Sequence, residues 1–259
     1  MNWKKKLATY ASLTVLATFI IHIINKLIYF MSTIDNLLGR KEGLYYEWRF
    51  GKIFYTKEGT GKPILLIHDL SACSSEYEWN RIVSDLSKKN TVYTLDLLGC
   101  GKSDKPNFTY TNFLYVQLVT DFINNVIGEK ADVIVTGNSC SFVLMACHNN
   151  DEIIDRILLI NPPSISSISK VPTKRTKMLK FIINIPFIGT LLFNLLHSKD
   201  SIEQTFMTEY FYNPQFVDDE IVKTYCESAQ ISKTQSKYLF ASIKGKYTTA
   251  NITECLTHI

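Results

Sequence analysis

The stretch VIVTGNSCSFVLMAC, Val133 to Cys147, decides how the rest of this sequence is interpreted. Its first half is a short apolar run, which is typical of a β-strand that is buried on both faces. The polar turn Gly-Asn-Ser-Cys-Ser follows, and the second apolar stretch favours a helix. Ser139 therefore stands between a buried strand and a helix, where the helix N-terminus can face its hydroxyl. This position makes Ser139 a candidate nucleophile.

Apolar runs of the same kind recur along the chain and predict a sheet. The runs are Ile64–Ile67, Thr91–Asp96, Asp132–Thr136 and Arg156–Asn161. Helical stretches separate them, and the clearest one, Tyr110 to Ile127, has two adjacent apolar rows and stops at Gly128. A second, weaker helix is expected from Glu76 to Lys88, and a hairpin around Gly51. Alternating strands and helices predict an α/β fold, with a mostly parallel sheet and helices on both faces.

The pattern changes after residue 163, where no further strand-like run is found. Residues 164–250 read as a helical insertion that covers a pocket, so the α/β core is expected to span residues 45–163. The apolar stretch Met178–Leu196 could form a membrane helix, but Lys180 and Pro186 interrupt it and favour the cap interpretation.

The N-terminus has the composition of a membrane anchor. Lys4–Lys6 precede Leu7–Ile24, which holds no formal charge and nearly crosses a hydrocarbon core of roughly 30 Å. Continuation to Phe30, with Lys26 reaching toward the headgroups, adds length. A cleaved signal peptide is the alternative, but no A-x-A site precedes Lys26. We expect residues 1–32 to form a cytoplasmic tip and a single transmembrane helix, with a linker over residues 33–44.

Charge sets the orientation of this anchor. Lys4–Lys6 favour a cytoplasmic N-terminus and an extracytoplasmic domain, although Lys26, Arg40 and Lys41 on the other flank oppose this. The net charge of +4 is too small, and too evenly spread, to indicate a nucleic-acid-binding protein. The six cysteines form no CxxC pair and lie near no histidine at ligand spacing, so no metal site is predicted.

Two further motifs follow the first two buried runs. His68-Asp69-Leu70 comes after the first run, and Asp96-Leu-Leu-Gly-Cys-Gly-Lys-Ser-Asp-Lys-Pro106 comes after the second. Together with the turn at Ser139, these motifs resemble those of the α/β-hydrolase superfamily, in the same order and at the same spacing. The resemblance covers about Tyr45 to Asn161 and implies the α/β-hydrolase fold. In the second motif, Ser103 and Asp104 are expected to hold the loop by hydrogen bonds.

The resemblance also implies roles for individual residues. Ser139 matches the nucleophile, and the N–H groups of Cys140 and Leu70 match the donors of an oxyanion hole. Gly137 and Ser141 match the small residues that flank the nucleophile in the elbow. A serine at this position implies acyl transfer through an ester intermediate, so the expected substrate is a small carboxylic ester, thioester or similar acyl compound.

The motif at His68 departs from the family pattern. His68 matches a histidine that positions the loop, and Asp69 stands where the family has glycine. This substitution puts the loop's backbone angles in question, although aspartate tolerates unusual turns better than most residues. The resemblance implies no metal and no organic cofactor.

The acid and the base of a triad are missing from the expected places. In this fold the acid and the histidine follow the serine, each after a later strand. His148, His197 and His258 are the histidines beyond Ser139, and none follows a strand-like run. Residues 251–259 read as the start of a return to the core. We therefore expect an incomplete chain of a serine hydrolase; the alternatives are a non-catalytic binding protein on this fold or an acyltransferase.

Overall fold

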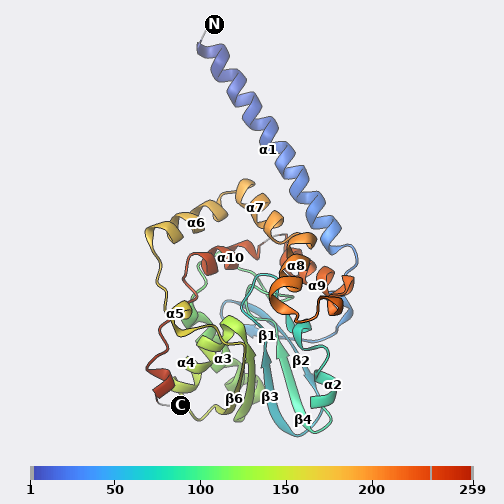
Figure 1. Ribbon diagram of the computed structural model, residues 1–259, viewed down its shortest axis with the longest axis vertical. Coiled ribbons are helices and arrows are strands. Elements are labelled where there is room, and N and C mark those ends of the chain that lie inside the picture. Colours follow the sequence, from blue (N-terminus) through green and yellow to red (C-terminus); the bar gives the residue numbers. More distant parts are fainter. Residues whose placement is uncertain (1–2, 234, 258–259) are drawn as a thin grey trace.

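The computed structural model describes residues 3–233 and 235–257. In these residues a sheet with strand order β1-β2-β4-β3-β5-β6 forms the centre of the domain (Figure 1). The strands are β1 (Leu44–Trp48), β2 (Gly51–Glu58), β3 (Lys62–Ile67), β4 (Asn90–Leu95), β5 (Ala131–Thr136) and β6 (Ile154–Ile160). The β3–β4, β3–β5 and β5–β6 pairs are parallel, whereas the β1–β2 hairpin adds to β4 in antiparallel orientation. The predicted mostly parallel sheet is confirmed.

Both faces of the central strands are buried, which explains their continuous apolar runs. Leu65 and Ile67 belong to the large core cluster that holds α3 (Asn112–Phe122) and α4 (Cys140–Asn149). Ile64 and Leu66, at the alternate positions of β3, pack on the other face with Trp79. Successive side chains of a strand point to opposite faces, so each helical layer takes every second residue.

The helices between the strands begin and end at residues with the expected chemistry. Thr111 caps α3, and its side chain accepts a hydrogen bond from the backbone N–H of Leu114. The helix continues as a π-turn, η3 (Ile123–Ile127), and stops at Gly128, which has a φ of +79°. The weaker helix expected from Glu76 to Lys88 is shorter: it consists of η2 (Glu76–Trp79) and α2 (Val83–Leu86).

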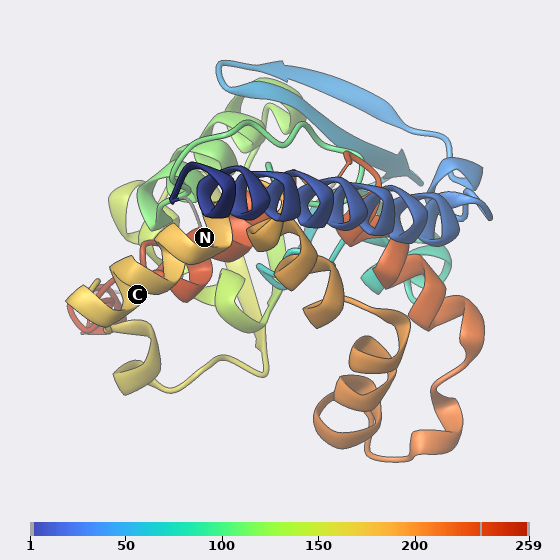
Figure 2. The same cartoon turned by 90° about the horizontal axis from the view of Figure 1, so that it is seen from above.

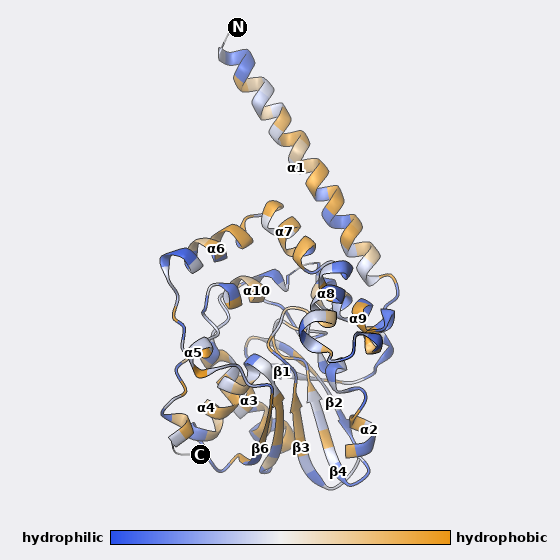
Figure 3. Cartoon of the chain, viewed as in Figure 1, coloured by the Kyte–Doolittle hydropathy of each residue, from blue (hydrophilic) through white to orange (hydrophobic). Residues whose placement is uncertain are grey.

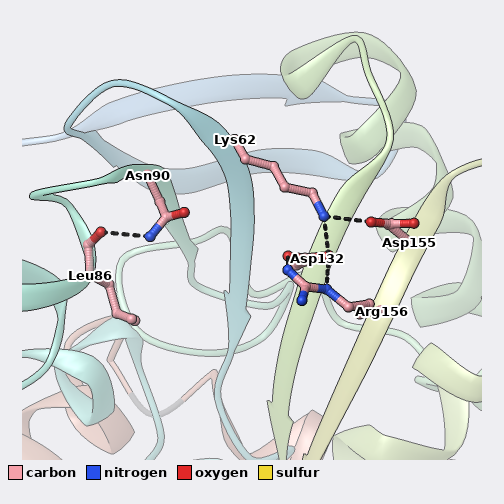
Figure 4. Close-up of polar contacts among 6 residues, drawn as sticks. All are labelled: Lys62, Leu86, Asn90, Asp132, Asp155 and Arg156. Carbon is pink, nitrogen blue, oxygen red and sulfur yellow. Dashed lines mark hydrogen bonds and ion pairs between the residues drawn. The ribbon is translucent and has the colours of Figure 1, made fainter.

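The amino ends of the parallel strands carry an ion-pair cluster (Figure 4). The ammonium of Lys62 lies 2.9 Å from Asp132 and 2.5 Å from Asp155, and the Arg156 guanidinium lies 2.6 Å from Asp132. The hydrogen bond from Arg156 is the largest cause of the lowered pKa of Asp132, and Lys62 adds to it. These contacts tie β3, β5 and β6 together at the edge opposite the pocket described below.

The described part of residues 164–250 is helical and contains no strand, as predicted. Its helices are α5 (Ile165–Ile168), α6 (Lys174–Asn184), α7 (Ile188–Leu196), α8 (Lys199–Thr205), η5 (Phe206–Tyr210), η6 (Pro214–Phe216), α9 (Asp219–Gln230) and α10 (Lys237–Lys244), and a last short turn, η7 (Cys255–Thr257), follows the cap. α6 and α7 meet at an angle of 101° around Pro186. They lie above the sheet, on the side from which the N-terminal helix leaves the domain (Figure 1).

The N-terminal helix α1 (Trp3–Thr33) is long and apolar enough to cross a membrane. Most of it projects away from the domain (Figure 1), and its outer part is mainly hydrophobic (Figure 3). Asn25 is its one buried residue among those described; its side-chain amide donates to the Phe187 carbonyl over 3.1 Å. Asn194 donates in turn to the Asn25 side-chain oxygen over 2.9 Å. These contacts attach the base of α1 to α7 (Figure 2).

The segment expected as a polar linker, residues 33–44, packs on the cap. It includes the short helix η1 (Leu38–Arg40), and Leu38 is buried. The first amides of a helix need an external acceptor, and here the Glu227 carboxylate accepts from the N–H groups of Leu37 and Leu38, over 2.6 and 3.3 Å. This segment therefore joins α1 to α9.

Candidate active site

A pocket of about 910 Å³ lies between the carboxyl edge of the sheet and the cap. Its floor comes from the loops after β3 and β5, and its walls come from cap residues that include Leu196, Phe206 and Tyr225. In open α/β sheets, ligands bind outside the carboxyl ends of the strands. The pocket therefore lies where the fold places a binding site.

Ser139 lies beneath this floor. β5 runs into a tight turn, η4 (Gly137–Ser139), and α4 starts at Cys140. The Ser139 side chain is fully buried, and its hydroxyl donates to the His68 carbonyl over 2.6 Å. Gly137 and Asn138 line the pocket in its place. In this turn Gly137 adopts the left-handed backbone conformation, with a φ of +54°, whereas Ser139 has a helical φ of −68°.

The carboxylate of Asp69 occupies the space above this turn. One of its oxygens accepts from the backbone N–H of Asn138 over 2.6 Å and from the Asn138 side-chain amide over 3.1 Å. The backbone N–H of Leu70 is a further group that lowers the pKa of this carboxylate. A Cβ atom at Gly137 would lie only 2.2 Å from the same oxygen, so glycine is required there. Burial raises the pKa of Asp69, and the Asn138 hydrogen bonds oppose that shift.

One of the two predicted oxyanion donors is engaged, because the Cys140 N–H donates to the Gly137 carbonyl. The other, the Leu70 N–H, is among the groups that lower the pKa of Asp69. Of the small elbow residues, Ser141 is buried and donates to the Asn138 carbonyl over 3.1 Å. The structure therefore brings together the residues that the resemblance selects, in an arrangement where the Ser139 hydroxyl and the Cys140 N–H already have partners within the protein.

His68 connects the loops after β3 and β4. The Leu97 N–H donates to His68 Nε2 over 3.0 Å, so the proton of the neutral ring is on Nδ1, which donates to the Asp69 carbonyl over 2.7 Å. Burial lowers the pKa of this imidazole to about 4, and the ring is therefore neutral at physiological pH. Both ring nitrogens form hydrogen bonds with the loop backbone, so His68 holds the two loops in place.

The second motif has the hydrogen bonds expected of it. The Ser103 hydroxyl donates to the Asp96 carbonyl over 2.6 Å and accepts from the Phe54 N–H over 2.8 Å. The Asp104 carboxylate accepts from the Lys52 N–H over 2.8 Å. These contacts bind the loop to β2 and support the edge of the site.

Glu78 is a site residue that the sequence analysis did not identify. Its carboxylate lines the pocket and accepts from the Asp69 N–H over 3.2 Å and from the Thr136 hydroxyl. Burial raises the pKa of Glu78 to about 7, and the neighbouring Asp69 charge adds to the increase, against the hydrogen bond from Thr136. The two carboxylates thus form an acidic floor beside the turn. No local pattern indicated this, because Thr136 is distant in the sequence.

The histidines beyond Ser139 have different surroundings. His197 lines the pocket, but its Nδ1 contacts the Phe193 carbonyl at 2.9 Å and burial lowers its pKa to about 4. His148 is exposed at the end of α4, and His258 lies outside the described residues. Among the hydrogen bonds within residues 3–233 and 235–257, the Ser139 hydroxyl has the His68 carbonyl as its partner and no carboxylate or imidazole.

Comparison with known proteins identifies the family. The chain is 34% identical over 86 residues to a 2-hydroxy-6-oxo-6-(2'-aminophenyl)hexa-2,4-dienoic acid hydrolase of Metapseudomonas resinovorans, a match that covers 33% of this chain and 29% of that protein. It is 25% identical over 110 residues to a soluble epoxide hydrolase of Corynebacterium sp. (strain C12), covering 42% and 38% of the two chains. These matches thus span well under half the length of each curated relative.

A solved structure supports the fold. The epoxide hydrolase CorEH superimposes with a TM-score of 0.63 at 17% identity, over 82% of this chain and 77% of that one. The family model described as "Alpha/beta hydrolase family" matches residues 64–248, which is more than half of the chain and includes both the sheet loops and the cap. The chain therefore belongs to the α/β hydrolase family.

Proposed function

We propose that this chain is a membrane-anchored hydrolase that acts on a carboxylic ester or a related acyl compound, with Ser139 as its nucleophile. The observation that carries the proposal is the place of Ser139, between the carboxyl end of β5 and the N-terminus of α4, directly under the pocket floor. A hydroxyl here can be aimed at a bound carbonyl, and the helix N-terminus stabilises developing negative charge.

Catalysis requires a rearrangement of the turn. The Ser139 hydroxyl has to leave the His68 carbonyl and face the pocket. The Asp69 carboxylate has to move away from the turn, and the Cys140 N–H has to leave the Gly137 carbonyl, so that the N–H groups of Leu70 and Cys140 can bind the oxyanion. A serine nucleophile also needs a histidine base and an acid that orients it. Since no imidazole among residues 3–233 and 235–257 hydrogen-bonds to the Ser139 hydroxyl, the proposal includes a base and an acid supplied from outside the described residues.

Two features support the substrate class and the anchor. The pocket walls are largely apolar and aromatic, which suits a hydrophobic acyl group. The apolar side chains of α1 are exposed along its outer length, as expected of a helix that faces lipid, and Lys4–Lys6 favour a cytoplasmic N-terminus with the domain outside. Extraction of the chain from membranes by alkaline carbonate would contradict the anchor.

Labelling with a fluorophosphonate serine probe tests the nucleophile. The protein purified from its native membranes in detergent, with the groups that supply the base and the acid, is expected to label, and Ser139→Ala is expected to abolish the label. Ser201→Ala is the matched control, because Ser201 lines the same pocket from the cap and should not affect labelling. Label that persists in Ser139→Ala would refute the assignment. Product analysis with an added alcohol separates hydrolysis from acyl transfer to that alcohol.

A second candidate function is binding of a ligand without turnover. The specific observation in its favour is that the Ser139 hydroxyl and the Cys140 N–H are engaged within the protein, while the Asp69 carboxylate fills the space above the turn. A folded chain that binds an acyl compound stoichiometrically, is never labelled by the probe and releases no product would establish this function instead.

A further inference from the structure

The cap contacts α1 at a defined position along that helix. The His22 ring of α1 lies edge-on to the Phe187 ring, with 5.8 Å between the ring centroids. One turn further along α1, Asn25 donates to the Phe187 carbonyl. His22 belongs to the apolar stretch Leu7–Ile24. If α1 spans a bilayer, the start of α7 therefore lies at the level of the membrane surface.

The hairpin of α6 and α7 presents large apolar side chains to solvent at this level. Met178 is 65% exposed, Phe181 69% and Ile188 57%. Phe187 joins them, 41% exposed, at the bend between the helices. Figure 3 shows hydrophobic residues along α7 and the second half of α6, at the top of the domain beside α1. Several large apolar side chains exposed on two adjoining helices are typical of an interaction site.

The charge of the hairpin indicates its partner. Residues 174–196 contain the basic residues Lys174, Arg175, Lys177 and Lys180 and no acidic residue. Lys174, Arg175 and Lys177 are exposed on the first turns of α6, next to Met178. Apolar and basic side chains together on a short helix are typical of helices that lie in the surface of an anionic membrane.

The bend between α6 and α7 has a defined backbone geometry. Phe187 holds a left-handed φ of +60°, which is uncommon for an aromatic residue. A Cβ atom at Gly189 would lie 2.1 Å from the Ile183 carbonyl, so the close approach of α7 to the end of α6 depends on glycine. The resulting angle of 101° prevents the pair from forming one straight span.

We propose that the α6–α7 hairpin docks on the surface of an anionic phospholipid bilayer, the same bilayer into which α1 inserts. The proposal rests on the membrane anchor proposed above. A cleft of about 670 Å³ continues this surface, with an apolar wall from Leu27, Phe30 and Phe187 and with Lys26 and Lys237 among its lining residues. Acyl chains can contact the apolar wall while phosphate groups lie near the lysines. Docking places the cap of the pocket directly at the source of a lipophilic substrate.

Quenching of tryptophan fluorescence by brominated lipid tests this docking. The full chain is reconstituted in vesicles of phosphatidylcholine, with or without phosphatidylglycerol. The Trp3→Phe background removes the tryptophan of α1, and the remaining Trp48 and Trp79 are buried in the domain. Phe181→Trp reports on α6. Ile82→Trp is the matched control, since Ile82 is 40% exposed and precedes α2, far below the hairpin in Figure 1.

We expect at least twofold more quenching for Phe181→Trp than for Ile82→Trp, with lipids brominated near the headgroup more effective than lipids brominated deep in the chain. Phosphatidylglycerol should increase the effect, and Lys174→Gln with Arg175→Gln and Lys177→Gln should remove that increase. Equal quenching at both positions, in a chain that resists carbonate extraction, would refute docking while leaving the anchor intact. Stronger quenching by deep bromines would show an inserted hairpin and also refute it. Extraction by carbonate would instead refute the anchor.

Discussion

The contact between Asp69 and the turn before Ser139 can be tested with Gly137→Ala. Gly137 has a φ of +54°, and an added Cβ would meet the Asp69 carboxylate at 2.2 Å. Two separate costs follow from this geometry. The first is the left-handed backbone conformation, which costs an L-residue roughly 1–2 kcal/mol. The second is displacement of Asp69 from the N–H of Asn138, a charge-assisted hydrogen bond worth roughly 1.5–3 kcal/mol. The expected loss in the free energy of unfolding is about 2.5–5 kcal/mol.

The two costs can be separated because the chain offers a matched glycine. Gly128 has a φ of +79°, and a Cβ there would meet nothing within 4 Å. Gly128→Ala should therefore show the backbone cost alone, about 1–2 kcal/mol. In an Asp69→Gly background the clash disappears, and Gly137→Ala should cost no more than Gly128→Ala does. The coupling between positions 69 and 137 is expected to be roughly 1.5–3 kcal/mol.

Urea unfolding of the full chain in mild detergent, followed by circular dichroism, measures these energies. The wild type, the single variants and the double variant complete the cycle, and Gly128→Ala gives the strain reference. If Gly137→Ala costs the same in the Asp69→Gly background as in the wild type, the Asp69 carboxylate does not fill the space above Gly137. The hydrogen bonds from Asn138 to Asp69 would then be in doubt as well, since they depend on that placement.

Three further predictions concern other contacts. Glu78 holds its proton more tightly in the folded chain, with a pKa of about 7, than in the unfolded chain, where it has the usual value of 4.5. The stability contributed by this group is therefore full below pH 4.5 and falls as the pH rises toward 7, by roughly 2–3 kcal/mol. Glu78→Gln should flatten this part of the plot of unfolding free energy against pH. An unchanged slope in the variant would contradict the raised pKa of Glu78. Thr56 and Thr94 are buried opposite each other in β2 and β4, with their hydroxyl oxygens 2.7 Å apart. Thr94→Val should lower the free energy of unfolding by about 1–3 kcal/mol, because it leaves the Thr56 hydroxyl unpaired, whereas the double variant with Thr56→Val should be nearly neutral. If thermal unfolding shows that the losses of the two single variants add in the double variant, the two hydroxyls do not form a pair. Glu227→Ala removes the acceptor for the N–H groups of Leu37 and Leu38, and should speed hydrogen exchange at these two amides at least tenfold compared with Glu220→Ala, which removes only an exposed carboxylate.

The sequence predicted the framework of the fold because burial on two faces leaves a continuous apolar run. This signal identified β3, β4, β5 and β6, and the absence of such runs after residue 163 identified the helical cap. The tight turn before α4 was also visible, since a glycine and small polar residues follow β5 directly. Each of these features is local, because the residues that determine it lie within a few positions of one another in the sequence.

The state of the candidate site could not be predicted in the same way. The turn contains both Gly137 and Ser139, and the sequence does not show which of them takes the left-handed conformation. The Asp69 side chain decides the outcome, and its partner Asn138 lies 69 positions away. The Glu78 contact with Thr136 and the Glu227 contacts with residues 37 and 38 are long-range in the same sense. Such hydrogen bonds leave no periodic pattern, and tertiary packing alone creates them.

If α1 spans a bilayer as proposed, the attachment of Asn25 to α7 couples bilayer thickness to the pocket. A transmembrane helix that is longer than the local hydrocarbon layer tilts. Phe187, just before α7, and Asn194, within it, hold α1, and the last residue of α7, Leu196, lines the pocket. A change in the tilt of an inserted α1 would therefore displace a wall of the pocket through one short helix. We expect the volume available to a ligand to differ between thin and thick membranes.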